Sequence, residues 1–172
     1  LYVANELPED AEECVKKALL DGVDDPSLHY LLGNIYAVQG RLDDARRYLE
    51  AYLGNRPGNR DAMILLANLL SAEALSKRDR IPVGELKEYA DRIRLLNVDD
   101  PKGWMVQAAV LCKSRPRKFI EAIVLLEKAL RKMPENPGVK RQLACAHRDY
   151  GWILTMTHRD TAMDHFKTFL EI

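Results

Sequence analysis

Residues 26–59 have the sequence PSLHYLLGNIYAVQGRLDDARRYLEAYLGNRPGN, and this stretch decides the fold. Apolar residues recur in it at spacings of three and four, which is typical of amphipathic helices. Gly40 separates two such segments, and Pro57 follows the second one. The stretch therefore predicts a pair of helices joined by a short turn.

The same pattern recurs along the chain. A side chain whose oxygen can cap a helix precedes each unit, and the four are Asp25, Asn59, Asp100 and Asn136. Three of them are followed directly by a proline, a residue that suits the first helical position. The units begin at residues 26, 60, 101 and 137, which are 34, 41 and 36 residues apart. Helical segments with a period near 34 residues predict stacked helix pairs.

Each unit also repeats its packing residues. The first helix contains a small residue that close approach of two helices requires, in the order Gly33, Ala67, Ala108 and Ala144. The second helix packs through an apolar set that starts at Ala45, Leu86, Ala122 and Ala162. Through these positions the chain resembles the tetratricopeptide repeat (TPR) family, most closely at Leu32-Gly33, Tyr36, Gly40, Ala45 and Pro57. The resemblance implies an all-α, right-handed α-solenoid of stacked antiparallel helix pairs.

The resemblance covers the whole chain and divides it into a partial repeat and four repeats, with boundaries at 1–25, 26–59, 60–100, 101–136 and 137–172. The repeats at 60–100 and 137–172 have insertions between their two helices, and we expect the first insertion, around residues 77–82, to lengthen the preceding helix. In residues 1–25 we expect the end of a first helix followed by a second helix at 7–23, and we expect no polar capping helix after Phe169. We therefore expect a part of a longer array, or uncapped ends that self-associate.

Composition and charge exclude several classes of protein. The chain has 26 basic and 26 acidic residues, which argues against a general nucleic-acid binder. Cys14, Cys112 and Cys145 are odd in number and form no C-x-x-C motif, so neither a disulfide framework nor a structural zinc site is predicted. No apolar stretch reaches the roughly 18 residues of a membrane span. We expect a cytoplasmic location, with periplasmic or other export left open.

No catalytic motif is present. The sequence has no phosphate-binding loop, dinucleotide fingerprint, zinc-protease motif or nucleophile elbow. We therefore expect no enzymatic activity, no catalytic residue, no cofactor and no metal. His29 and His147 occupy repeat positions that large packing residues normally hold, so we expect both in the core or semi-buried.

The TPR resemblance also implies a binding surface. In that family the first helix of each repeat lines a concave groove that holds peptides. The corresponding apolar strip is Tyr30, Ile64 and Met105, and the amides that could bond a peptide backbone are Asn34 and Asn68. The last two repeats add four cations, Lys102, Lys113, Arg141 and Arg148. A basic end of the groove can attract carboxylates.

These residues predict a non-catalytic protein–protein interaction module or assembly scaffold that binds a partner segment in the groove. The partner is expected to be a protein or peptide with an acidic segment. The alternative is a regulatory or docking region of a larger enzyme, export or envelope-associated protein.

Overall fold

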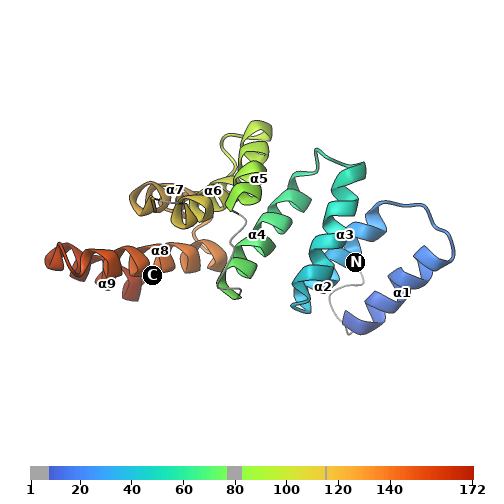
Figure 1. Cartoon of the computed structure of the whole chain (residues 1–172), viewed down its shortest axis with the longest axis horizontal. Coiled ribbons are helices and arrows are strands. Elements are labelled where there is room, and N and C mark those ends of the chain that lie inside the picture. The colour runs from blue at the N-terminus through green and yellow to red at the C-terminus, as the bar shows by residue number, and fades with distance from the viewer. Residues whose placement is uncertain (1–7, 77–82, 115) are drawn as a thin grey trace. The chain divides into compact units, whose positions relative to one another are not determined.

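The computed structural model describes residues 8–76, 83–114 and 116–172, and these residues form helices and turns but no strand (Figure 1). The helices are α1 (Pro8–Leu20), α2 (Ser27–Val38), α3 (Leu42–Asn55), α4 (Arg60–Ser76), α5 (Val83–Leu96), α6 (Pro101–Lys113), α7 (Phe119–Lys132), α8 (Pro137–Leu154) and α9 (Arg159–Glu171). They fall into two compact units, residues 1–77 with α1 to α4 and residues 78–172 with α5 to α9. The all-α prediction is confirmed for the described residues.

In the first unit, helices that follow one another in the sequence pack together, α1 on α2, α2 on α3 and α3 on α4. Leu32 and Tyr36 of α2 are buried together with Leu49 of α3 and Met63 of α4. Gly33 allows the close approach of α2 and α3, because a Cβ at this position would lie 2.7 Å from the Cγ of Leu49. The predicted role of the small residue is confirmed at this position.

The predicted capping residues hold the helix starts. In each case a side-chain oxygen accepts a hydrogen bond from a backbone N–H at the start of the next helix. The four bonds, each written donor first, are Ser27 N–H to Asp25 (2.8 Å), Ala62 N–H to Asn59 (2.9 Å), Lys102 N–H to Asp100 (3.2 Å) and Gly138 N–H to Asn136 (2.9 Å). These bonds satisfy N–H groups that have no partner inside the helix. Helices α6 and α8 begin at the proline itself, whereas α2 begins one residue after Pro26.

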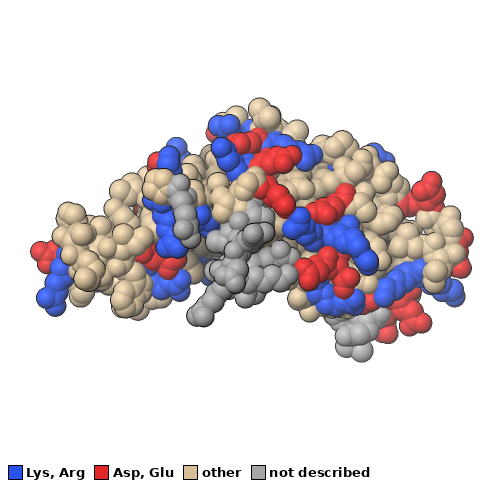
Figure 2. All heavy atoms as spheres, in the orientation of Figure 1, with Lys and Arg blue, Asp and Glu red and all other residues tan. Residues whose placement is uncertain are grey.

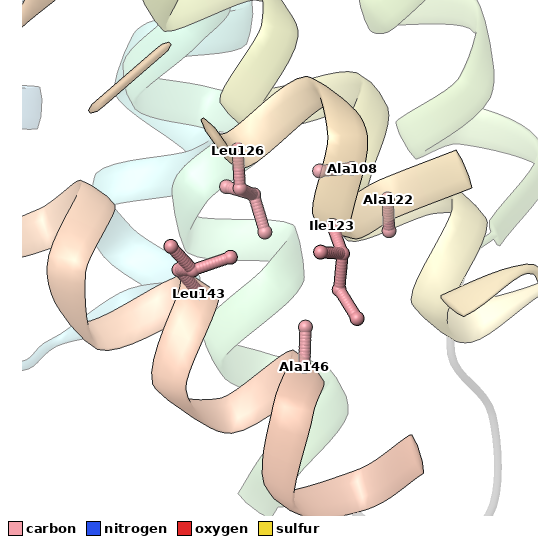
Figure 3. Packing of buried hydrophobic residues seen from close by; sticks show 6 residues of the cluster. All are labelled: Ala108, Ala122, Ile123, Leu126, Leu143 and Ala146. Carbon is pink, nitrogen blue, oxygen red and sulfur yellow. The ribbon is translucent and has the colours of Figure 1, made fainter. Parts of the chain in front are cut away.

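In the second unit the sequential packing continues from α5 to α9, and α6 also contacts α8. Part of the core joins three helices (Figure 3) and consists of Ala108, Ala122, Ile123, Leu126, Leu143 and Ala146. Ala108 comes from α6, and α8 contributes Leu143 and Ala146 against the side chains of α7. The interface therefore repeats the arrangement in which the first helix of one repeat covers the second helix of the repeat before it.

The insertions are visible in the helix lengths. Helix α4 has 17 residues and α8 has 18, whereas the other described helices have 12 to 14. The insertion around residues 77–82 lies outside the described residues, as does the partial first helix expected before residue 8.

Candidate peptide-binding face

Helices α6 and α8 are the first helices of two successive repeats, and they contact each other in the second unit. Near the start of α8, a Cβ built on Gly138 would lie 3.4 Å from the Cε of Met105, so the Met105 side chain rests against α8. Toward the other end, Cys145 and Asp149 of α8 act electrostatically on the thiol of Cys112 on α6 and raise its pKa. We call the surface formed by these two helices the α6–α8 face.

The environment of Cys112 shows what kind of chemistry this face supports. Burial, and then the negative charge of Asp149, raise the pKa of Cys112 to about 11, against the opposing effects of Lys113 and Arg117. A thiol with such a pKa is protonated at neutral pH and is a poor nucleophile. Cys112 therefore contributes to packing on this face and does not supply a reactive thiol.

The four predicted cations of this face differ in their surroundings. Lys102 and Arg141 are exposed. Arg148 forms an ion pair with Asp149, with Nη2 and Nε lying 2.8 and 2.9 Å from the same carboxylate oxygen. Lys113 is half-buried, and burial lowers its pKa. The structure thus places all four on α6 and α8, but part of their charge is balanced locally.

The predicted residues of the first unit are less available to a ligand. The ring of Tyr30 packs against the ring of Tyr52 with centroids 5.2 Å apart. The Asn34 amide donates a hydrogen bond of 2.9 Å to the backbone carbonyl of Tyr30. Ile64 is only 7% exposed and belongs to the core, whereas Asn68 is exposed. Of the predicted apolar strip, Tyr30 and Ile64 lie in the first unit and Met105 lies in the second.

One polar cluster was not predicted. The carboxylate of Glu12 on α1 accepts hydrogen bonds from Tyr36 Oη and Gln39 Nε2, each at 3.0 Å, and forms ion pairs with Lys16 and Arg41. Hydrogen bonds from Lys16 and then Gln39 lower the pKa of Glu12 to about 2. The cluster ties α1 to α2. Its partners beyond α1 are 24 to 29 residues from Glu12, and no sequence motif links them.

A second unpredicted feature is a histidine pair. His147 is only 7% exposed, which confirms its predicted place in the core, and its Nδ1 lies 2.8 Å from Nδ1 of His165 on α9. Burial, and then the proximity of His165, lower the pKa of His147. Among the described residues, no group of three or more His, Cys, Asp or Glu side chains is placed to hold a metal ion. In that part of the chain, no helix combines the length and the apolar character needed to cross a membrane.

Comparison with known proteins agrees with this architecture. Residues 1–75 match the family model described as Tetratricopeptide repeat. No curated protein matches the chain. MamA (41 to the end) from Desulfovibrio magneticus RS-1 is a similar solved structure, with 19% identity, a TM-score of 0.66, and coverage of 95% of this chain and 84% of that one.

A second similar structure is TTC0263, a thermophilic TPR protein in Thermus thermophilus. It has 18% identity and a TM-score of 0.64, over 95% of this chain and 82% of that one. At these identities the likeness concerns the fold. It confirms the predicted fold class of stacked helix pairs, and the match over residues 1–75 confirms the TPR resemblance for that part of the chain.

Proposed function

We propose that this chain is a non-catalytic interaction module whose α6–α8 face binds an acidic segment of a partner protein. The proposal is supported by the match of residues 1–75 to tetratricopeptide repeats and by the fold that the chain shares with solved TPR proteins. Arrays of helix pairs present extended surfaces, which suit the binding of protein segments. A protein-binding or scaffold role follows from the fold. The choice of this face and of an acidic segment is the proposal.

The observation that carries the proposal is the contact between α6 and α8, which brings the cations of two repeats onto adjoining helices. Lys102 and Arg141 are exposed there, and Met105 supplies a half-buried apolar side chain beside them. A segment with carboxylates near an apolar residue would match both features. Charge complementarity of this kind increases the rate of encounter and orients the partner.

The surroundings of Arg148 and Lys113 limit how strongly the face attracts an anion. Asp149 already neutralises Arg148 across 2.8 Å, and a carboxylate of the partner would have to compete with it. Lys113 is half-buried, so its charge is less available to a partner than those of Lys102 and Arg141. We therefore expect Arg141 and Lys102 to contribute most of the attraction.

The test uses the whole chain and a fluorescein-labelled peptide of alternating Glu and Leu residues, with fluorescence anisotropy as the readout. The double variant Lys102→Glu/Arg141→Glu should weaken binding by about tenfold or more at low salt. The matched control Lys128→Glu/Arg131→Glu reverses two exposed charges on α7 and should leave the affinity close to that of the unchanged protein.

Two results would overturn the placement. One is no binding of the acidic peptide by the unchanged protein at low salt. The other is an equal loss of affinity in both double variants, because the effect would then depend on net charge and not on the α6–α8 face. Circular dichroism of each variant verifies that the helices are intact.

A further inference from the structure

The histidine pair lies between the two helices of the last repeat. Nδ1 of His147 on α8 is 2.8 Å from Nδ1 of His165 on α9, and the ring centroids are 5.0 Å apart. The two rings therefore extend away from each other on either side of the facing nitrogens. His147 is buried and His165 is half-buried, so the contact is largely shielded from solvent.

The other repeats have aromatic or aliphatic side chains at these two positions. His147 follows the small residue of its helix by three residues, and His165 follows Ala162 by three. The corresponding pairs of the earlier repeats are Tyr36 and Tyr48, Leu70 and Tyr89, and Leu111 and Leu125. Tyr36 and Tyr48 contact each other with ring centroids 5.5 Å apart, and Leu111 and Leu125 are both partly buried against the core cluster. The last repeat alone places two titratable rings at this contact.

The facing nitrogens of the pair can share one hydrogen. One Nδ1 donates its N–H and the other accepts it, both in the neutral pair and when one ring carries an extra proton on Nε2. When both rings are protonated, both Nδ1 atoms carry a hydrogen and neither can accept. The hydrogen bond is then lost, and two positive charges lie in contact at a largely buried site, which is unfavourable.

The groups that face the pair offer little to offset a second charge. From α7, the exposed carboxylate of Glu127 favours the charged form of His147, but burial and the proximity of His165 outweigh it and lower the pKa of His147. From α8, the Tyr150 ring meets the His165 ring edge-on with centroids 4.8 Å apart. An exposed carboxylate is screened by water, so its effect on the buried ring is weak.

The acidic residues next to the pair in the sequence are already in ion pairs. Asp149 of α8 lies 2.8 Å from Arg148, and Asp164 of α9 lies 3.8 Å from Lys167. On the face that Figure 2 shows, mostly uncharged atoms cover the left end, where α8 and α9 lie in Figure 1. A doubly protonated pair would therefore gain little stabilisation from its surroundings.

We propose that the histidine pair is a pH-dependent latch, which holds α9 against α8 at neutral pH and releases α9 in mildly acidic conditions. The latch is closed while the pair contains at most one extra proton, and it opens when the second proton binds. The six buried residues of the core cluster on α6, α7 and α8 are apolar, so this part of the second unit should stay packed when α9 is released. The latch does not depend on what binds the α6–α8 face.

The test measures amide hydrogen exchange of the whole chain by mass spectrometry from about pH 7.5 to about pH 5, the range in which histidine titrates, after correction for the intrinsic effect of pH on exchange. Because the pKa of His147 is lowered, the closed contact is fully stable above 6.5 and loses stability as the pH falls below that value. The equilibrium constant for opening of α9 should therefore increase by up to about tenfold per pH unit below 6.5. The amides of α7 serve as the internal reference and should change much less.

Two variants remove the second proton in different ways. His147→Leu/His165→Leu gives the last repeat the leucines that the third repeat has at these positions, so α9 should stay protected at all pH values tested. His165→Asn keeps a hydrogen-bonding group near the place of Nδ1 but cannot be protonated, so the pH dependence should be weaker. The matched control is His158→Gln, because His158 is exposed in the turn before α9 and its loss should leave the pH dependence unchanged.

The proposal is overturned if α9 of the unchanged chain opens no more in acid than at neutral pH. It is also overturned if α7 opens to the same extent, because acid would then unfold the whole unit, or if the leucine variant keeps the pH dependence, or if His158→Gln removes it. Circular dichroism verifies that each variant is helical. If the leucine variant does not fold, His165→Asn decides, and an unchanged pH dependence in that variant overturns the proposal.

Discussion

Replacing Gly33 by alanine should destabilise the first unit, although alanine is the better helix former. The new Cβ would lie 2.7 Å from Cγ and 2.8 Å from Cδ2 of Leu49, and 3.5 Å from the carbonyl oxygen of Ala45. Leu49 is fully buried, so its side chain can give way only by displacing the residues packed around it. Either this displacement or a separation of α2 and α3 loosens the packing around the contact.

The size of the effect follows from two opposing contributions. Overpacking of a buried site costs about 1–3 kcal/mol. Exchange of glycine for alanine within a helix returns about 0.5–1 kcal/mol. We therefore expect a net loss of about 1 kcal/mol in the free energy of unfolding, within a range of about 0–2.5 kcal/mol.

Urea denaturation followed by circular dichroism measures the loss, with Gly54→Ala as the control. Gly54 lies in α3, and a Cβ there meets nothing within 4 Å, so the control should gain up to about 1 kcal/mol. The reasoning is refuted if Gly33→Ala is neutral or stabilising, because the helices would then have room for a methyl group. A loss of stability in Gly54→Ala would show that alanine does not stabilise helix α3 relative to glycine, contrary to the expected gain.

Three further predictions concern a cap and two titrating groups. Asn136→Ala removes the acceptor of two N–H groups of α8 and should cost about 1 kcal/mol in urea denaturation, whereas an equal midpoint would contradict the capping role. The pKa of Glu12 is lowered to about 2, so its contribution to stability is complete above its ordinary value of 4.5 and should be lost as pH falls toward 2. The Glu12→Gln variant should show a weaker dependence over that range than the Glu13→Gln control, and equal dependences would count against the cluster. The pKa of His147 is lowered, so the folded state resists protonation of this side chain. The free energy of unfolding should therefore fall by up to about 1.4 kcal/mol per pH unit as the pH drops below 6.5. If this pH dependence is unchanged in His165→Phe, the role of the histidine pair is refuted.

The helix starts and the close helix contacts could be predicted because they depend on residues close together in the sequence. Asn136 caps the helix that begins at the next residue, and the cap bond reaches only two residues along the chain. Gly33 was predictable for a related reason, since the repeat recurs in phase and marks the side of the helix that meets its neighbour. Local chemistry and periodicity together were sufficient for these features.

The Glu12 cluster and the histidine pair could not be predicted by the same means. The position of His147 in the repeat indicated a buried residue, and burial was confirmed. Nothing in the repeat indicated that His165, 18 residues later, would supply its hydrogen-bond partner. Polar contacts between helices depend on side-chain reach and on the depth of packing, which a pattern of apolar positions does not specify.

The candidate binding residues illustrate a related limit. The family pattern identifies which side of a first helix Ile64 and Asn68 occupy. It does not indicate how much of each side chain its neighbours leave exposed to solvent. Ile64 is 7% exposed and Asn68 is exposed, although both were assigned to one groove. Repeats of equal pattern can therefore differ in how many of their side chains reach solvent.

The zero net charge of the chain is the sum of 26 basic and 26 acidic residues and does not describe any single surface. Glu12 is matched by Lys16 and Arg41 in the first unit. On the α6–α8 face, Asp149 balances Arg148, which leaves Lys102 and Arg141 exposed at the surface. Charges in contact with water are screened over about 10 Å at 0.1 M salt, so the attraction of an acidic segment should decline steeply as salt is added. Electrostatics would then determine how such a segment approaches, and apolar contacts would determine how long it stays.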